Sequence, residues 1–302
     1  MPEAAPQQSI GSASELAAFW SFEQSLINTT LDSLLHRPSG ASERLYAGMR
    51  HAVLAPAKRL RPILAIVAYR SLGGRDQRIY PVAAAIEMLH TYSLIHDDLP
   101  CMDDDDQRRG QPTVHIAFDE ATAVLAGDAL QALAFEILAR EGSAEIICTL
   151  AKAVGPEGMA DGQMADLEAE GQTPTEALVT SIHQRKTGRL ITASLLTGAA
   201  MGSVTADSPP FRALVEYGDA LGLAFQIVDD ILELTETAEK LGKPTGSDLK
   251  HGKVTYPAAV GLDHARIRAG ELAGAAKRAL KSYDGDPKLL LAMADFIVSR
   301  DR

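Results

Sequence analysis

The sequence lacks several features that would assign it to whole classes of protein. It has only two cysteines, Cys101 and Cys148, which cannot form a disulfide framework, so we expect a reducing cytoplasm. Its 29 basic residues are outnumbered by 40 acidic ones, and the net charge of −11 argues against non-specific binding to nucleic acid. No apolar run approaches the roughly 20 residues of a membrane span, and no signal peptide opens the chain. These absences predict a soluble cytoplasmic protein.

Strand-like runs of alternating polarity are also missing, as is any internal repeat of fixed period. Segments rich in Ala, Leu, Glu and Ile instead show helical spacing between breakers such as Gly73-Gly74 and Pro209-Pro210. The sequence therefore predicts an all-α protein with roughly ten or more helices in a single domain. Residues 1–13 are small and polar, and we expect them to be poorly ordered, which leaves 14–302 as the domain.

The most informative stretch is an apolar helix that leads into six aspartates. Asp97 and Asp98 come first, Pro100 follows, and Asp103 opens the second group. Because proline removes a backbone donor and clashes one turn back, the helix should end or bulge just before it and let Asp103 fold back toward Asp97. Carboxylates with few other donors suit Mg²⁺ shared with a substrate phosphate. Taken alone, however, this run could equally be a solvated acidic loop.

A second acidic site, far away in the sequence, favours the metal interpretation. An apolar segment again delivers a carboxylate pair, Asp229-Asp230, which is followed by Glu233. Asp229 and Glu233 are spaced four residues apart, so they lie on one helical face. Two aspartate pairs, each at the end of an apolar helical segment, are typical of two walls of a pocket that binds a diphosphate through metal ions.

With these motifs the chain resembles the trans-isoprenyl diphosphate synthases, from about Lys58 to the end, and is closest to the bacterial type of farnesyl diphosphate synthase. The first family signature, Asp-Asp-x4-Asp followed by two arginines, here reads Asp97-Asp98 to Asp103 and then Arg108-Arg109. The second signature reads Asp229-Asp230-Ile-Leu-Glu233. The resemblance implies an antiparallel helical bundle around a central cavity, which is the isoprenoid synthase type I fold, and pairing into a homodimer.

The resemblance also implies roles for the matching residues. Metal binding is implied for Asp97, Asp98, Asp103, Asp229, Asp230 and Glu233, with about three Mg²⁺ ions bound together with the allylic diphosphate. Binding of isopentenyl diphosphate is implied for Lys58, Arg61, His90 and Arg109. Binding of the allylic diphosphate is implied for Arg108, Lys186, Thr187, Gln226, Lys243 and Lys253. The five motif aspartates, Arg108 and Lys186 would share the catalytic role.

Two positions depart from the family pattern. Pro56-Ala57 stand where the family usually has Gly-Gly ahead of Lys58, and proline offers no N–H to a ligand. Glu233 stands where aspartate is more usual, and since it keeps the charge we expect metal binding to survive. On its own, the basic run at Lys58 would be interpreted as surface charge. Inside the first motif, we interpret His96 as a packed or hydrogen-bonding helix residue and Cys101 as a spacer.

The implied reaction is a magnesium-dependent, head-to-tail condensation of isopentenyl diphosphate with dimethylallyl or geranyl diphosphate. Tyr92 lies five residues before Asp97, more than one helical turn below it, and is followed by Ser93. A tyrosine there would close the end of the cavity and limit the length of the product chain. This predicts farnesyl diphosphate as the product, with geranylgeranyl diphosphate as the alternative. A class I terpene cyclase would be expected to lack the basic site and Asp229-Asp230, and a non-catalytic partner subunit would have eroded aspartate motifs. The cyclase and the partner-subunit interpretations are therefore less favoured.

Overall fold

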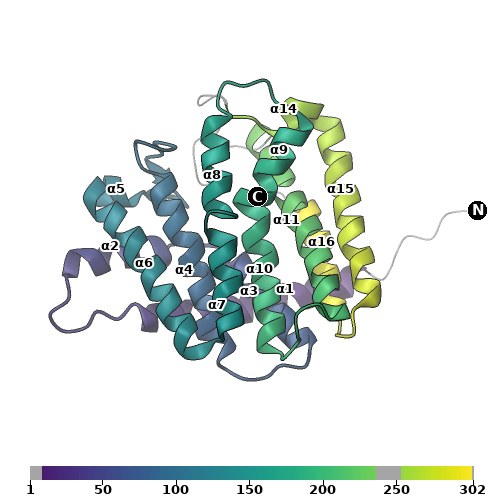
Figure 1. Cartoon of the computed structure of the whole chain (residues 1–302), viewed down its shortest axis with the longest axis horizontal. Helices are drawn as coiled ribbons and strands as arrows, with labels where there is room; N and C mark the ends of the chain where they lie inside the picture. The colour runs from purple at the N-terminus through teal and green to yellow at the C-terminus, as the bar shows by residue number, and fades with distance from the viewer. Residues whose placement is uncertain (1–8, 236–252, 301–302) are drawn as a thin grey trace, which may run out of the picture.

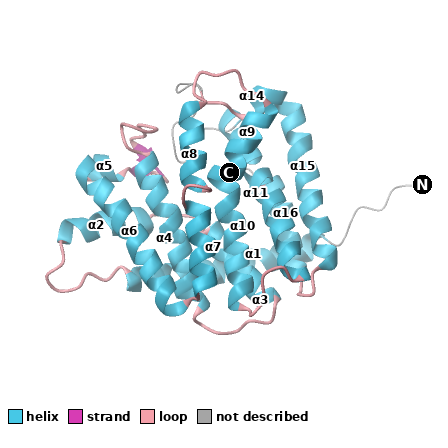
Figure 2. Cartoon of the chain, viewed as in Figure 1, coloured by secondary structure: helices cyan, strands magenta, loops and turns pink. Residues whose placement is uncertain are grey.

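The structure is a computed structural model that describes residues 9–235 and 253–300, and this part of the chain is almost entirely helical (Figure 2). Its α-helices are α1 (Ser9–Leu34), α2 (Glu43–Val53), α3 (Leu60–Ser71), α4 (Ile79–Asp97), α5 (Val114–Ala117), α6 (Glu120–Glu141), α7 (Ala144–Val154), α8 (Met159–Glu168), α9 (Glu176–His183), α10 (Arg189–Met201), α11 (Pro209–Thr235), α14 (Tyr256–Val260), α15 (Leu262–Ala279) and α16 (Lys288–Ser299). A π-helical turn (Gln184–Gly188) joins α9 to α10, and a 3₁₀ turn (Leu280–Ser282) follows α15. Strands β1 (Gln107–Arg108) and β2 (Gln111–Pro112) form a short antiparallel hairpin. The predicted all-α fold is confirmed.

The helices stand side by side as a bundle (Figure 1), and α3 and α4 are largely buried in it. Most residues of these two helices are buried, 10 of 12 in α3 and 13 of 19 in α4, as is typical of a helix that is apolar and covered by others. α4 packs along α6 and α3, α10 packs along α3 and α11, and α11 packs along α15. Both α4 and α11 carry their acidic motifs in their last turns, so the bundle brings the two motifs to one end.

The first helix is longer than the sequence predicts. α1 already begins at Ser9, inside the segment 1–13 that we expect to be poorly ordered. Residues 1–8 lie outside the described part of the chain, so for them the expectation stays a prediction.

α6 is the one described helix that could cross a membrane by length and composition alone. It has 22 residues and is largely apolar, although charged residues interrupt its apolar runs. However, 44% of its most apolar window is buried inside the protein, where α6 packs against α4. A core helix of a soluble protein passes the same test, so α6 is a weak indication of a membrane span.

Candidate active site

A cavity of about 1220 Å³ opens where the acidic ends of α4 and α11 meet. It is also bordered by α8, by the π-helical turn and by the segments just before α3 and α14. With one exception, the described residues predicted to form the site all line it: Lys58, Arg61, His90, Tyr92, Ser93, Asp97, Asp103, Arg108, Arg109, Lys186, Thr187, Gln226, Asp229, Asp230, Glu233 and Lys253. The exception is Asp98. Lys243 lies outside the described residues.

The first acidic motif has the broken-helix geometry that its sequence predicts. α4 ends at Asp97, and the chain then turns back so that the backbone N–H of Asp103 donates to the carbonyl oxygen of Asp97 at 2.8 Å. The next residue, Asp104, adopts a left-handed backbone with φ of 50°, and its N–H donates to the carbonyl oxygen of Leu99 at 3.1 Å. Asp97 and Asp103 therefore both border the cavity although they are six residues apart.

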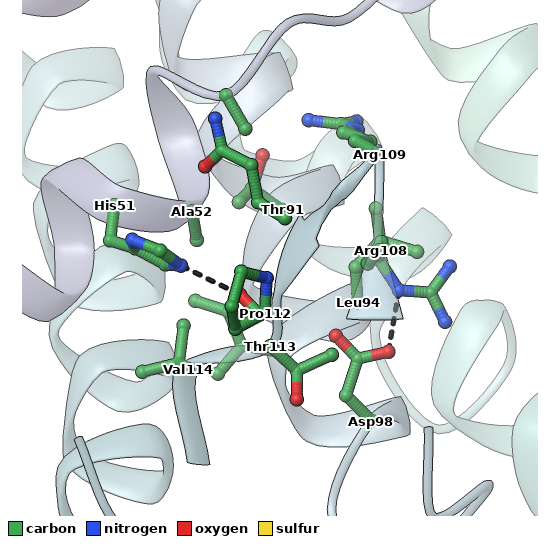
Figure 3. A pocket seen from close by; sticks show the side chains of 13 residues that line it. His51, Ala52, Thr91, Leu94, Asp98, Arg108, Arg109, Pro112, Thr113 and Val114 are labelled. Atoms are coloured by element: carbon green, nitrogen blue, oxygen red, sulfur yellow. Dashed lines mark hydrogen bonds and ion pairs between the residues drawn. The ribbon is translucent and has the colours of Figure 1, made fainter. Parts of the chain in front are cut away.

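Asp98 faces a different place from Asp97. Successive residues of a helix point about 100° apart, and Asp98 lines a different pocket from Asp97. Asp98 is 4% exposed and accepts a hydrogen bond from Nε of Arg108, at the edge of a smaller pocket between α4, the hairpin and His51 (Figure 3). Burial raises the pKa of its carboxyl to about 7, although the Arg108 guanidinium opposes the shift. The structure thus places Asp98 as a link between α4 and the hairpin, outside the lining of the large cavity.

In the second acidic motif, both aspartates border the cavity. Asp229 and Glu233 lie on the same face of α11 and border the cavity, as their spacing predicts. Asp230 also reaches the cavity wall, but both its oxygens accept hydrogen bonds: Oδ2 from the backbone N–H of Tyr256 at 2.7 Å, and Oδ1 from Nε2 of Gln226 at 3.2 Å. It is 5% exposed, and burial raises its pKa to about 7. The bond from Tyr256 ties α11 to the start of α14, and the bond from Gln226 lies within α11.

Cationic side chains stand at the carboxylates of the cavity. Nζ of Lys253 is 2.9 Å from Oδ1 of Asp103, and an Arg300 nitrogen is 2.6 Å from Oδ1 of Asp229. Burial opposes ionisation of Asp103, but the ammonium groups of Lys253 and Lys186 outweigh it and lower the pKa of that carboxyl. Among the described residues, no three His, Cys, Asp or Glu side chains lie close enough to hold an ion by themselves. The carboxylate oxygens at the cavity suit a hard cation that takes its remaining ligands from a bound phosphate and water.

The π-helical turn presents Lys186 and Thr187 to the cavity. Nζ of Lys186 donates to Asp166 on α8 at 2.6 Å, and the Thr187 hydroxyl donates to Oε1 of Gln226 at 2.8 Å. α8 can approach this turn only because residue 162 is glycine, since a Cβ there would lie 2.2 Å from the backbone nitrogen of Lys186. Single π turns within helices are frequent at functional sites.

The basic run at Lys58 divides into a cavity side and a core side. Lys58 and Arg61 line the cavity, whereas Arg59 adopts a left-handed backbone and turns into the core, where it is 2% exposed. There Nη1 of Arg59 lies 2.8 Å from Oε1 of Glu87, and an Arg109 nitrogen lies 3.6 Å from the same oxygen. Glu87 therefore holds two arginines at once.

Burial, together with the neighbouring cations, lowers the pKa of Arg61 and of His90 on this side of the cavity. Burial lowers the pKa of Arg61 to about 10, while the Glu87 carboxylate opposes that shift. Burial and then the guanidinium groups of Arg61 and Arg109 hold the pKa of His90 well below its ordinary value. His90 is therefore a neutral hydrogen-bonding group beside two cations.

Three residues of the site escaped the sequence analysis. Glu87 had a visible signal, because a lone carboxylate in the apolar segment 82–89 needs a buried partner. His183, whose Nε2 lies 3.4 Å from Oδ2 of Asp230, had no local signal. The same holds for Arg300, whose guanidinium carbon lies 3.9 Å from the centre of the Phe225 ring while it pairs with Asp229.

Known proteins resemble this chain over most of its length. The model of the polyprenyl synthetase family matches residues 42–283. A farnesyl diphosphate synthase from Geobacillus stearothermophilus is 43% identical, over 94% of this chain and 97% of its own. A geranylgeranyl diphosphate synthase from Cyanophora paradoxa is 40% identical, over 91% of this chain and 93% of its own. The crystal structure of a geranyltransferase from Helicobacter pylori, complexed with magnesium and isoprenyl diphosphate, has a TM-score of 0.79 at 31% identity and covers 99% of this chain and 98% of that one.

Glu87→Gln should lower the free energy of unfolding by about 3 kcal/mol, because it leaves the buried Arg59 without its countercharge. Glu136→Gln is the matched control, since it breaks the exposed pair with Arg140 and should cost less than about 1 kcal/mol. Urea denaturation followed by circular dichroism measures both. Equal losses in the two variants would contradict the role given to Glu87.

Proposed function

The chain belongs to the polyprenyl synthetase family, and on that premise we propose that it is a prenyltransferase that condenses isopentenyl diphosphate with dimethylallyl or geranyl diphosphate to give farnesyl diphosphate. The observation that carries this proposal is the charge pattern of the cavity. Two acidic walls are flanked by two cationic groups, one around Arg61 and Arg109 and the other around Lys186 and Lys253. One diphosphate would need only one such group, whereas two groups suit a reaction between two diphosphates.

In the proposed reaction, the protein stabilises the negative charge of a diphosphate leaving group. The C–O bond between the allylic carbon and its diphosphate breaks, the double bond of isopentenyl diphosphate forms the new C–C bond, and the departed diphosphate accepts the proton that is lost. Cations placed where negative charge develops lower the barrier to such a step. We assign this task to Arg108, Lys186 and Lys253, with Thr187 and Gln226 beside them. Lys243, which has the same expected role, lies outside the described residues.

Isopentenyl diphosphate would bind on the other side, against Lys58, Arg61 and Arg109, with neutral His90 as a further hydrogen-bond donor. The absence of Gly-Gly ahead of Lys58 is compatible with this assignment, because side chains of α1 hold the segment in place. Trp20 donates to the carbonyl oxygen of Lys58 at 2.8 Å. Gln24 likewise donates to the carbonyl oxygen of Ala57 at 2.6 Å.

The carboxylates at the cavity suit Mg²⁺. We propose that Asp97, Asp103, Asp229 and Glu233 hold the ions and that Asp98 and Asp230, whose oxygens already accept protein hydrogen bonds, anchor the two helix ends. When bound with the diphosphate, Mg²⁺ would neutralise part of its charge. The Helicobacter pylori relative was crystallised with magnesium and isoprenyl diphosphate, which supports the identity of the ion. A number of about three ions stays a prediction from the sequence.

The product length is proposed from the cavity wall. Tyr92 is 9% exposed and lines the cavity more than one turn below Asp97, with Ser93 beside it. A ring at this depth leaves room for a short chain only. Geranylgeranyl diphosphate remains the second candidate, because the Cyanophora paradoxa relative is named for that product.

We further propose that two copies of the chain pair through α5 and α6. Large apolar side chains are exposed there: Ile116 is 50% exposed, Val124 41% and Leu125 58%. Apolar side chains gathered on one outer face are typical of a protein interface. A homodimer that buries this face would also remove the apolar surface of α6 from water.

A cytoplasmic location is part of the proposal. Cys101 and Cys148 are both free and exposed, a state that a reducing compartment maintains.

A product assay tests the proposed reaction. Purified protein is incubated with Mg²⁺, labelled isopentenyl diphosphate and either dimethylallyl or geranyl diphosphate, and the dephosphorylated alcohols are separated by length. We expect farnesol as the main product, no product after chelation with EDTA, and a loss of about a thousandfold in kcat for Asp97→Asn. Asp263→Asn, at an exposed position of α15, should behave as wild type. Failure to elongate either primer would refute the proposal.

Tyr92→Ala should shift the main product from farnesol toward geranylgeraniol, because it removes the ring that ends the cavity. Tyr92→Phe keeps the ring and should leave the product unchanged. The same alcohol assay measures both variants. If Tyr92→Ala still makes farnesol, the cavity ends at another residue.

Leu125→Glu should convert the proposed dimer to monomer, because it places a charge at the centre of the exposed apolar face. Ile267→Glu is the control, since Ile267 is 59% exposed on α15, on the opposite side of the bundle from α6 (Figure 1). Sedimentation velocity measures the mass of each variant. A dimer that survives Leu125→Glu would place the interface elsewhere.

A further inference from the structure

We propose that Gly127 is a specificity-determining residue, because its missing side chain forms the recess on α6 that keeps the His96 ring out of the path of the growing prenyl chain. The inference rests on the proposed prenyl transfer and concerns how far the product is extended. Gly127 acts through His96 and touches no substrate itself, so its role is positional.

His96 lies directly against the backbone of α6. Its Nε2 atom is 3.1 Å from the carbonyl oxygen of Val124. A Cβ atom on Gly127 would come within 2.1 Å of the same nitrogen and within 2.8 Å of the ring carbon Cε1. Packed atoms do not approach so closely, so the ring and a side chain at position 127 cannot occupy this place together. Only glycine leaves the recess open.

The same ring is part of the cavity wall. His96 and Tyr92 both line the cavity, and their spacing of four residues puts them on one face of α4. Their rings meet edge-on, with centroids 5.9 Å apart. Helical side chains lean toward the N-terminus of their helix, so the His96 ring covers the turn between Asp97 and Tyr92. A chain that extends from the acidic motif toward Tyr92 must pass this ring.

The backbone of α6 closes one side of the ring, and Tyr92 lies next to it along α4. His96 lines the cavity and 30% of its side chain is exposed, so we expect a ring expelled from the recess to turn toward the cavity. It would narrow the channel between the acidic motif and Tyr92. The short tail of dimethylallyl diphosphate ends before this constriction, whereas the tail of geranyl diphosphate extends past it.

The test compares the two primers in one variant. For Gly127→Ala we expect kcat/KM for geranyl diphosphate to fall about tenfold relative to that for dimethylallyl diphosphate, so that geraniol accumulates in the alcohol assay. His96→Ala/Gly127→Ala removes the expelled ring and should restore the wild-type ratio. Gly270→Ala, on α15 with no atom within 4 Å of the added Cβ, is the control and should match wild type.

A Gly127→Ala protein that folds, as judged by circular dichroism, and keeps the wild-type primer ratio would overturn the inference. So would a double variant that fails to restore the ratio, because the glycine would then serve only the packing of α4 on α6. If Gly127→Ala does not fold, His96→Trp tests the same point, since a larger ring does not fit the recess and should give the same shift. An unchanged ratio in His96→Trp would also overturn the inference. A wild-type protein that elongates neither primer would refute the proposed function instead.

Discussion

Carboxylates that share a small volume repel one another, and this repulsion governs how the cavity is built. In each acidic pair the second aspartate is buried and held by donors of the protein, Arg108 for Asp98 and the Tyr256 backbone for Asp230. The first aspartate remains at the cavity. This arrangement reduces the negative charge that faces a substrate, and it also anchors the helix end that carries the remaining carboxylate. The positions of α4, α11 and α14 all depend on these hydrogen bonds.

Much of the site could be predicted from the sequence because it follows local rules. A proline ends α4 and lets Asp103 fold back, and a spacing of four residues puts Asp229 and Glu233 on one face of α11. The absence of strand patterns gave the fold class in the same way. The roles of residues such as Lys186 needed the family resemblance as well, since no local rule assigns a lysine in mid-helix to a diphosphate.

The parts of the site that could not be predicted from the sequence depend largely on contacts between distant segments. Which of Asp97 and Asp98 lines the cavity depends on the direction in which each side chain points where α4 ends. The periodicity of a sequence does not locate the end of a helix to one residue. Arg59 separates from Arg61 because its backbone is left-handed, which is uncommon for a residue other than glycine. Arg300 meets Asp229 only because α16 packs on α11.

The π turn between α9 and α10 also bears on how this protein can evolve. Such a turn holds one residue more than a regular helix would, and it widens the backbone hydrogen-bonded ring. Deleting one residue from Gln184–Gly188 would give a continuous α-helix with better backbone bonding. It would also rotate Lys186 and Thr187 by about 100° relative to the helix on one side of the deletion. Selection for stability alone would favour that deletion. If the extra residue persists, selection has retained the binding geometry of this helix at the expense of a more stable backbone.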